Sequence, residues 1–295
     1  MTMQVNNPAA LETEVPIKGL DKNFYLDPAI YEHEKEAIFY RTWQFACHQS
    51  ELAEPGDHRL VRVADEELIV VKGHDGVIRA FYNVCAHRGH RLLEESGHLD
   101  RAIVCPYHGW AYDLDGRLRG ARRSDEVLGF CKDQVHLNEV LVEVFCGLVF
   151  VNLDKDAVPL VEIAADVEPT IRSFIPEIES IRFVDECLAY QDCNWKVSVE
   201  NYAECYHCQL VHSQSLAKGF VGLSDFEATL FESTLLHTST ADTGRSSPYN
   251  FDPDSGGRSG EFMSCFIWPN FAMNCYPGGY IRLGIIAPLA LDRAV

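Results

Sequence analysis

The sequence is short of positive charge and lacks a long apolar run. Its 295 residues include 25 Lys and Arg against 44 Asp and Glu, a formal net charge of −19. Because binding to DNA or RNA needs a basic surface, no nucleic-acid partner is expected. The most apolar stretch, residues 140–153, is interrupted by Glu143 and is too short to span a bilayer, so no membrane contact is expected.

Other absences narrow the class of protein further. Residues 1–16 show neither the basic nor the apolar region of a secretory leader, so a cytoplasmic location is expected. The chain lacks a glycine fingerprint for a dinucleotide, so it is not expected to bind NAD(P)H itself. With 47% apolar and 23% charged residues the composition is globular, with length for one large or two ordinary domains.

The first half of the chain predicts a helix followed by a small all-β domain. Asp27 can cap a helix that starts at Pro28 and runs to about residue 43, and residues 1–42 are expected to pack on the later domain. Predicted strands at 67–72 and 77–84 flank Gly73-His74-Asp75-Gly76, a hairpin signal. Residues 110–114 enter a second hairpin, and 147–151 form a closing strand. We assign 43–155 to this domain.

The second half, residues 156–295, predicts an α+β domain with an antiparallel sheet. A helical stretch at 160–174 is expected to break near Pro169. The further expected elements are a strand at 188–192, a helix at 196–210, strands at 229–238, 262–267 and 280–287, and a long loop at 244–260.

The 11 Cys residues of a cytoplasmic chain indicate thiols and metal ligands, not a disulfide framework. Two Cys–His pairs stand out. The chain reads Cys85-Ala86-His87 and, after seventeen residues, Cys105-Pro106-Tyr107-His108. Two thiolates and two imidazoles fit either one tetrahedral zinc ion or a two-iron, two-sulfur cluster with mixed ligands. The mixture of one Cys and one His in each pair favours the cluster. Cys47, Cys131 and Cys146 are expected to be core thiols, and His90 and His98 ordinary surface histidines.

A second constellation comprises Asn201, Glu204, His207 and His212. Two histidines with a distant carboxylate form the facial triad of non-haem iron oxygenases. On an ideal helix a spacing of five residues places the imidazoles about 140° apart. Both can reach one iron only if the helix loosens or ends, which predicts a π-bulge or a terminus at 208–211. These residues alone also allow incidental histidines, or a zinc site using Cys205 and Cys208.

The flanks of both constellations resemble those of one enzyme family. Cys85-Ala86-His87-Arg88-Gly89 and Cys105-Pro106-Tyr107-His108-Gly109-Trp110 resemble the two boxes of the Rieske domain of ring-hydroxylating-type oxygenases. Residues 199–212 resemble their catalytic motif, and the resemblance runs from about residue 25 to the end. It implies a cluster on Cys85, His87, Cys105 and His108, a mononuclear Fe(II) on His207 and His212, and Asn201 beside that iron. It also implies that Glu204 is the electron bridge between subunits.

The same resemblance implies a fold and partners. It indicates a Rieske [2Fe–2S] domain followed by a helix-grip catalytic domain, assembled as a homotrimer. Electrons would come from NAD(P)H through a flavin/iron–sulfur reductase. The family's third iron ligand is a carboxylate far downstream of the second histidine. Asp292 is close to the end, so we expect this ligand beyond residue 295 and the catalytic domain to be incomplete.

The expected activity follows from Glu204, the residue expected to be the electron bridge. Glu204-Cys205-Tyr206-His207-Cys208 is similar to the subgroup that oxidises quaternary ammonium compounds, such as carnitine, glycine betaine and stachydrine. The resemblance implies a monooxygenase that hydroxylates next to nitrogen and so cleaves a C–N bond. Aromatic side chains would hold the cation. One alternative is an aromatic-ring hydroxylating dioxygenase subunit. A second is a Rieske electron-transfer protein with no oxygenase site.

Overall fold

The computed structural model describes residues 2–5, 18–213, 226–240, 249–250, 252, 258 and 260–295. Its contacts divide the chain into two compact units. Unit 1 comprises residues 1–35, 158–178 and 187–295, and unit 2 comprises 36–157 and 179–186. Residues 179–186 thus group with unit 2, whereas the sequence predicted them in the second domain. In the described part of the chain, every helix is too short or too polar to cross a lipid bilayer.

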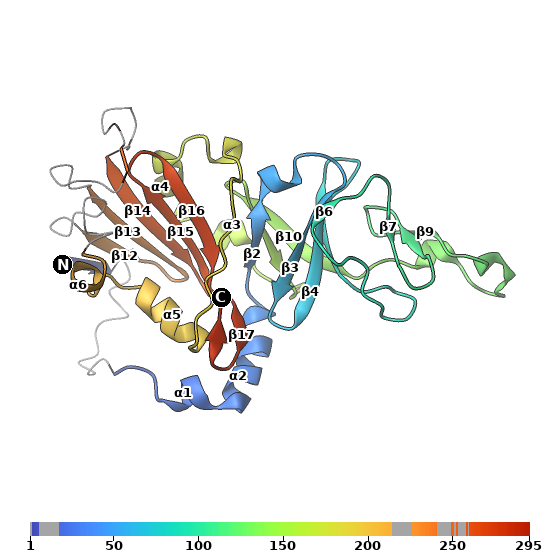
Figure 1. Ribbon diagram of the computed structural model, residues 1–295, viewed down its shortest axis with the longest axis horizontal. Coiled ribbons are helices and arrows are strands. Elements are labelled where there is room, and N and C mark those ends of the chain that lie inside the picture. Colours follow the sequence, from blue (N-terminus) through green and yellow to red (C-terminus); the bar gives the residue numbers. More distant parts are fainter. Residues whose placement is uncertain are drawn as a thin grey trace. The chain divides into compact units, whose positions relative to one another are not determined.

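Unit 2 is built on an antiparallel sheet of seven strands in the order β2-β11-β10-β5-β4-β3-β6 (Figure 1). Strand β4 is covered on both faces, because its consecutive residues Leu68, Ile69, Val70 and Val71 are all fully buried. The strands are β2 Gln44–His48, β3 Asp57–Val63, β4 Glu66–Lys72, β5 Ile78–Tyr82, β6 Gly97–His98, β10 Glu139–Phe145 and β11 Leu148–Asn152.

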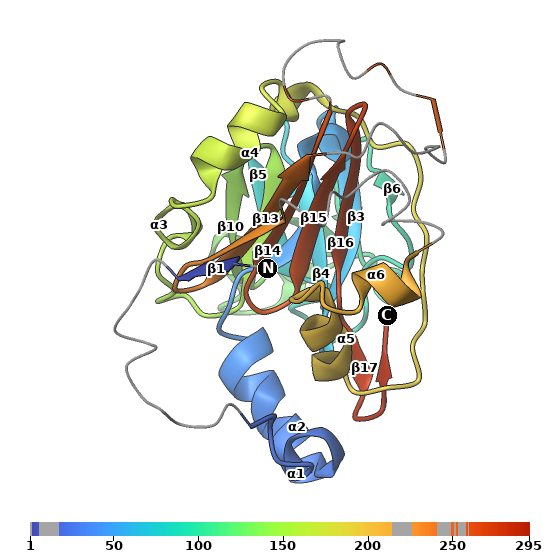
Figure 2. The same cartoon turned by 90° about the vertical axis from the view of Figure 1, so that its left-hand side faces the viewer.

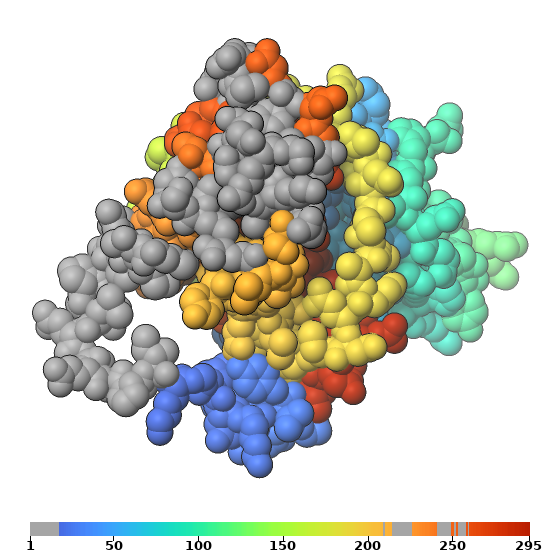
Figure 3. Space-filling model, turned by 60° about the vertical axis from the view of Figure 1, so that its left-hand side comes forward, coloured from blue at the N-terminus to red at the C-terminus, as the bar shows by residue number. Residues whose placement is uncertain are grey.

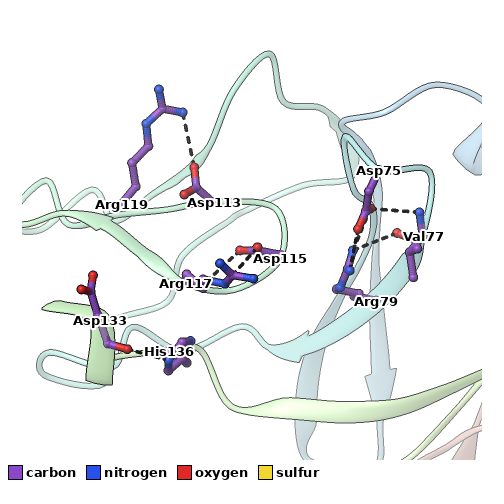
Figure 4. A network of polar contacts seen from close by, with 9 residues as sticks. All are labelled: Asp75, Val77, Arg79, Asp113, Asp115, Arg117, Arg119, Asp133 and His136. Carbon is purple, nitrogen blue, oxygen red and sulfur yellow. Dashed lines mark hydrogen bonds and ion pairs between the residues drawn. The ribbon is translucent and has the colours of Figure 1, made fainter.

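A smaller sheet in unit 2 consists of β7 Ile103–Val104, β8 Ala111–Tyr112 and β9 Leu118–Gly120. Its residues join a core cluster that also contains the side chains of Cys85 and Cys105. Nearby turns of unit 2 carry ion pairs, among them Arg79–Asp75 at 2.7 Å and Arg119–Asp113 at 3.4 Å (Figure 4). The two cysteines thus lie within the core of unit 2.

Unit 1 contains a sheet of six strands in the order β1-β12-β13-β14-β15-β16. All its neighbours are antiparallel except β1 and β12, which are parallel. Figure 2 shows α3 and α4 on one side of this sheet and α5 and α6 on the other. The strands are β1 Thr2–Val5, β12 Glu227–Leu230, β13 Thr234–Thr240, β14 Glu261–Ile267, β15 Phe271–Tyr276 and β16 Tyr280–Ile285; a separate hairpin pairs β17 Pro288–Ala290 with β18 Arg293–Ala294.

The helices are short. The α-helices are α1 Asn23–Leu26, α2 Pro28–Glu34, α3 Leu160–Ile163, α4 Glu168–Phe174, α5 Trp195–Tyr202 and α6 Cys208–Val211. A π-helical turn, Lys35–Phe39, follows α2, and 3-10 turns lie at Gln49–Leu52, Ser124–Glu126, Lys132–Gln134 and Ile178–Ser180.

A buried ion pair joins α2 to the start of α5. Both carboxylate oxygens of Glu34 accept from Lys196 Nζ, at 2.6 and 2.8 Å, and Trp195 Nε1 donates to the same carboxylate at 2.9 Å. All three side chains are buried. Such a pair costs several kcal/mol to break from one side, because the remaining charge stays buried. The contact therefore fixes where α5 begins.

Several expected elements are confirmed. Asp27 accepts a hydrogen bond from the Ala29 N–H at 2.8 Å and caps a helix that starts at Pro28. The hairpin at residues 73–76 and the buried closing strand β11 are present. The α+β class, with an all-β domain followed by an antiparallel-sheet domain, is also confirmed.

Other expectations were wrong. Residues 188–192 form no strand, because Leu188 and Tyr190 are exposed and Gln191 makes an isolated bridge to Ala294. The strand expected at 229–238 is a hairpin of β12 and β13, and β15 was missed. Cys131 is exposed rather than in the core, whereas Cys47 and Cys146 are buried. Most of the loop expected at 244–260 lies outside the described residues.

Candidate metal centres

The two Cys–His loops of unit 2 have matching backbones. In each, the Cys carbonyl accepts from the glycine four residues later: Gly89 N donates to Cys85 O at 2.9 Å, and Gly109 N to Cys105 O at 3.0 Å. Each Cys N–H in turn donates to the carbonyl five residues later, at 2.8 Å in both loops. Both glycines have positive φ, +68° and +70°, a conformation that side chains disfavour. Both loops thus need a glycine at this position, because other residues disfavour a positive φ.

These loops bring the four predicted donors together. Cys85 and Cys105 are each only 2% exposed, whereas His87 is half-buried and His108 is exposed. The two imidazole rings lie 4.7 Å apart between centroids. Thiols inside and imidazoles outside are the arrangement that a mixed-ligand [2Fe–2S] cluster needs, since each iron takes one pair of like donors. The residues therefore fit that group.

A tyrosine hydroxyl caps one of the thiols. The N–H of Ala86 donates to the hydroxyl of Tyr112 at 3.2 Å, and the same oxygen lies 3.1 Å from Cys85 Sγ. Because the oxygen accepts from the backbone, its own proton is available to the sulfur. Burial raises the pKa of Tyr112, followed by its hydrogen bond to Cys85, so the phenol keeps that proton. Sequence reasoning missed Tyr112, which looked only like a strand residue.

The outer imidazole of His87 has a fixed orientation. Its ring stacks on Trp110 with 4.5 Å between centroids and 11° between planes. Trp110 is itself held edge-on by Phe130 at 5.7 Å. Burial, then the neighbouring His108, lower the pKa of His87, which favours the neutral form that binds metals.

The second constellation lies where α5 breaks. Asn194 caps α5 by accepting from the Lys196 N–H at 3.1 Å, and the helix ends at Tyr202. Residues 203–207 are not helical, and α6 then spans Cys208–Val211 with His212 as its C-cap. The sequence predicted that the helix would loosen or end at residues 208–211. A helix does end there, because α6 stops at Val211 before His212, but the main interruption lies earlier, between Tyr202 and Cys208.

The break brings the two predicted iron histidines together. The rings of His207 and His212 have centroids 5.1 Å apart and planes at 70°. On a continuous helix they would point in directions about 140° apart. Figure 3 shows the stretch from α5 to α6 at the surface of unit 1, and Tyr206 and Leu210 are exposed there.

Glu204 is hydrogen-bonded to one of these histidines, His207. Its carboxylate lies 2.5 Å from Nδ1 of His207 and also accepts from the Tyr206 N–H. Burial raises the pKa of Glu204, but the hydrogen bonds from His207 and Tyr206 outweigh it and lower the pKa overall. A carboxylate on Nδ1 leaves Nε2 for a metal and fixes the ring's orientation. Asn201 lies exposed in the last turn of α5.

A disulfide joins the cysteines on either side of His207. Cys205 and Cys208 are joined, with 5.0 Å between their Cα atoms, while the other nine cysteines are free thiols. The sequence predicted thiols and ligands only, so this bond is a correction. In this state neither sulfur can serve the alternative zinc site. Among the described residues, no three His, Cys, Asp or Glu side chains converge on one point as ligands of a single ion.

Comparison with known proteins adds to this geometry. The profile of the Rieske [2Fe-2S] domain matches residues 42–136, and that of the ring-hydroxylating alpha subunit catalytic domain matches 179–294. The carnitine monooxygenase oxygenase subunit of Acinetobacter pittii is 36% identical over 260 residues, 87% of this chain and 68% of that protein. The chain belongs to the Rieske non-haem iron oxygenases.

Two further relatives show the breadth of this family. The 2-aminobenzenesulfonate 2,3-dioxygenase alpha subunit of an Alcaligenes species is 37% identical over 193 residues, 64% of this chain and 48% of that protein. The crystal structure of the quaternary ammonium Rieske monooxygenase CntA with L-carnitine matches with a TM-score of 0.81 and 33% identity, over 92% of this chain and 72% of that one.

Membership in the Rieske oxygenases makes the protein an oxidoreductase and implies two centres, the [2Fe–2S] cluster and a mononuclear iron. The chain spans about two thirds of the length of the carnitine monooxygenase subunits, 68% of one and 66% of another. The third iron ligand, expected beyond residue 295, stays a prediction. Asp292 lies exposed in the turn between β17 and β18.

Proposed function

We propose that this chain is the oxygenase component of a monooxygenase for a quaternary ammonium compound. It would hydroxylate a carbon next to nitrogen, after which the C–N bond breaks. The observation that carries the proposal is the contact between Glu204 and His207, in a chain whose relatives include carnitine monooxygenase subunits. A glutamate in that position was the feature by which the sequence predicted this subgroup.

We assign the [2Fe–2S] cluster to the two matching loops. Cys85 and Cys105 would hold the inner iron, and His87 and His108 the outer one. The group supplies storage for one electron near the protein surface. The chain's own contribution is orientation: the glycine turns set the loops, and Trp110 holds the plane of the His87 ring.

We assign the mononuclear iron to His207 and His212, with Asn201 beside it. The iron supplies the site where dioxygen is activated. Glu204 fixes Nδ1 of His207 and, being partly exposed, can also meet the cluster-bearing domain of another subunit. The hydrogen bond to His207 and the exposure of Glu204 support a role as the electron bridge in a homotrimer. Electrons would come from NAD(P)H through a flavin/iron–sulfur reductase in the cytoplasm.

The sheet of unit 1 offers a surface suited to a quaternary cation. On the side that α5 covers, the rings of Phe262 and Tyr276 lie 5.6 Å apart, and those of Tyr276 and Tyr280 lie 5.8 Å apart. A trimethylammonium group has no hydrogen-bond donor, so aromatic faces are its usual partners. We infer that these three rings hold it.

The experiment that tests the proposal measures substrate-dependent O₂ uptake and products. The full-length subunit, loaded with Fe(II) and supplied with a reductase, is offered carnitine, γ-butyrobetaine, glycine betaine, choline and simple aromatics. We expect coupled uptake with a quaternary amine, releasing trimethylamine or an aldehyde. Replacing His207 and His212 by Ala should abolish turnover while leaving the visible spectrum of the cluster intact. Turnover that survives this change would disprove the assignment.

A second candidate function, an aromatic-ring dioxygenase, is favoured by the 37% identity to the aminobenzenesulfonate dioxygenase subunit. The same panel separates the two functions. Uptake with aromatics alone, giving diols, would support the dioxygenase and reject the quaternary amine.

A further inference from the structure

The disulfide of unit 1 encloses one of the two predicted iron ligands. The chain reads Cys205-Tyr206-His207-Cys208, and the first and last of these residues are joined through their sulfur atoms. Two cysteines separated by two residues have the spacing of reversible redox pairs in proteins of reducing compartments. The other nine cysteines are free thiols, so this pair differs from the rest of the chain.

The segment that carries His207 has little regular structure of its own. Helix α5 ends at Tyr202, and α6 spans only Cys208–Val211. A helix of one turn is not stable by itself in water, because its nucleation costs more than one turn of hydrogen bonds returns. The carboxylate of Glu204 accepts from the Tyr206 N–H and contacts Nδ1 of His207. To these polar contacts the disulfide adds a covalent constraint.

The same bond also acts on the second histidine. Cys205 packs against a small apolar cluster that includes Phe262 of β14. Cys208 is buried, and its carbonyl accepts from the His212 N–H at 3.1 Å. The disulfide thus ties the turn that ends at His212 to a residue packed on the sheet, while His207 lies inside the closed loop. Breaking the bond therefore loosens both proposed iron ligands.

One sulfur of the pair lies close to the surface of unit 1. Cys205 is half-buried, whereas Cys208 is only 3% exposed. Tyr206, next to Cys205 in the chain, is exposed. A partly exposed sulfur in a surface loop can be reached by small thiols and oxidants, whereas a buried thiol is inert. Attack at Cys205 therefore offers a way to open the bond.

The chemistry of an oxygenase supplies an oxidant for this pair. When dioxygen takes up two electrons and two protons without oxidising substrate, hydrogen peroxide is released. One thiolate attacks a peroxide oxygen, the O–O bond breaks, and a sulfenic acid and water form; the second thiol then displaces the hydroxyl as water and makes the S–S bond. Two thiols and one peroxide thus give one disulfide and two waters. A cytoplasmic dithiol reverses the reaction by exchange and is itself oxidised.

We propose that Cys205 and Cys208 are a reversible redox switch that sets how firmly His207 and His212 hold the mononuclear iron. The disulfide keeps the loop closed and both histidines in place, and the dithiol lets the loop open. The proposal rests on the proposed function, because it describes regulation of that iron site. Peroxide released during uncoupled turnover would tighten the site at which it arose. The chain entropy removed by closing so short a loop corresponds to about a tenfold difference in iron retention.

The test measures the release of iron from the full-length enzyme in both redox states. Enzyme that carries its cluster but no mononuclear iron is reduced with dithiothreitol and desalted, and half of it is then treated with hydrogen peroxide. Both samples are loaded with Fe(II) without oxygen and mixed with a coloured Fe(II) chelator. Peptide mapping after alkylation reports the state of the two sulfurs. We expect the dithiol sample to release its mononuclear iron about ten times faster.

Three variants serve this test. Cys205→Ser and Cys208→Ser each prevent the bond and should release iron fast whether or not peroxide was added. Cys187→Ser removes an exposed free thiol from the same unit and should keep the full difference between the two samples. The visible spectrum of the cluster reports that each variant is folded. The two wild-type samples need no substitution, so they decide the matter even where a variant fails to fold.

The outcomes separate the switch from the proposed function. Equal release from the two wild-type samples, slower release from the dithiol sample, or a pair that stays reduced after peroxide would each overturn the switch. Turnover of a quaternary amine would leave the proposed function standing in all three cases. Redox-dependent release from an enzyme that oxidises no quaternary amine would support the switch and reject the proposed substrate.

Discussion

The carboxylate of Glu204 lies 2.5 Å from Nδ1 of His207, three residues later in the chain. In a continuous helix such a pair would sit on neighbouring turns with the backbone hydrogen-bonded between them. Here the helix is interrupted, and the Glu204 carboxylate accepts from the Tyr206 N–H. The Glu204 carboxylate thus binds a backbone N–H where the helix is interrupted, and it also holds His207, the proposed iron ligand.

The first prediction concerns this contact. If Glu204 is the proposed electron bridge, Glu204→Gln should leave the cluster spectrum unchanged but slow cluster oxidation in the presence of substrate and O₂ by about 100-fold, because the bridging charge is lost. Stopped-flow absorbance of the pre-reduced enzyme measures this rate. If Glu204 only orients His207, the variant should instead lose iron affinity by about 10–100-fold with normal oxidation once iron is restored. A normal rate at normal iron content would contradict both roles.

The second prediction concerns Tyr112. Its hydroxyl reaches the Cys85 sulfur at 3.1 Å, and such a donor stabilises the more negative, reduced state of a cluster. Tyr112→Phe should therefore lower the reduction potential by about 60 mV, which corresponds to a factor of ten for one electron. Spectroelectrochemical titration measures the midpoint. Tyr107→Phe, at an exposed ring beside His108, is the matched control and should not shift it.

The third prediction concerns the buried pair of Glu34 and Lys196. Glu34→Ala should lower the free energy of unfolding by about 3–5 kcal/mol, because it leaves Lys196 charged and buried. Glu126→Ala, in a pair with Arg123 in which both side chains are exposed, should cost less than about 1 kcal/mol. Urea unfolding monitored by tryptophan fluorescence measures both. Equal losses in the two variants would show that the buried pair contributes no more to the free energy of unfolding than an exposed pair does.

The fourth prediction concerns pH. Burial lowers the pKa of His237 to about 4 from an ordinary value of 6.5. The unfolded chain therefore takes up this proton between pH 6.5 and 4 while the folded chain does not. Stability from this group is complete above pH 6.5 and falls by about 3 kcal/mol as the pH drops toward 4. His237→Gln should reduce the difference between urea midpoints at pH 7 and pH 5; an unchanged difference would mean that His237 is not buried in neutral form.

Local signals in the sequence sufficed where one turn decides the structure. Asp27 followed by Pro28 predicted a helix start, and Gly73-His74-Asp75-Gly76 predicted a hairpin; both depend on backbone preferences of the residues themselves. The close approach of the predicted histidines was likewise foreseeable from their spacing, and the ring centroids of His207 and His212 lie 5.1 Å apart.

Long-range contacts explain most of what sequence reasoning missed. The sequence predicted a helix from 196 to 210, yet α5 ends at Tyr202. The hydroxyl of Tyr202 is hydrogen-bonded to Ser264 and Asn274 on the sheet. A strand was expected at 188–192, but among the described residues Gln191 alone of this segment forms a bridge, to Ala294. The Glu34–Lys196 pair and the Tyr112 cap join residues far apart in sequence, and no local pattern reveals them.

The alternation of residues along β14 has a consequence for redesign. Ser264 and Phe266 face α5, while Met263 and Cys265, both fully inaccessible to solvent, face the opposite side. Both sides of this strand are therefore enclosed, so a substitution at any of these four positions has to fit against close neighbours, and a search for new specificity there carries a cost in stability.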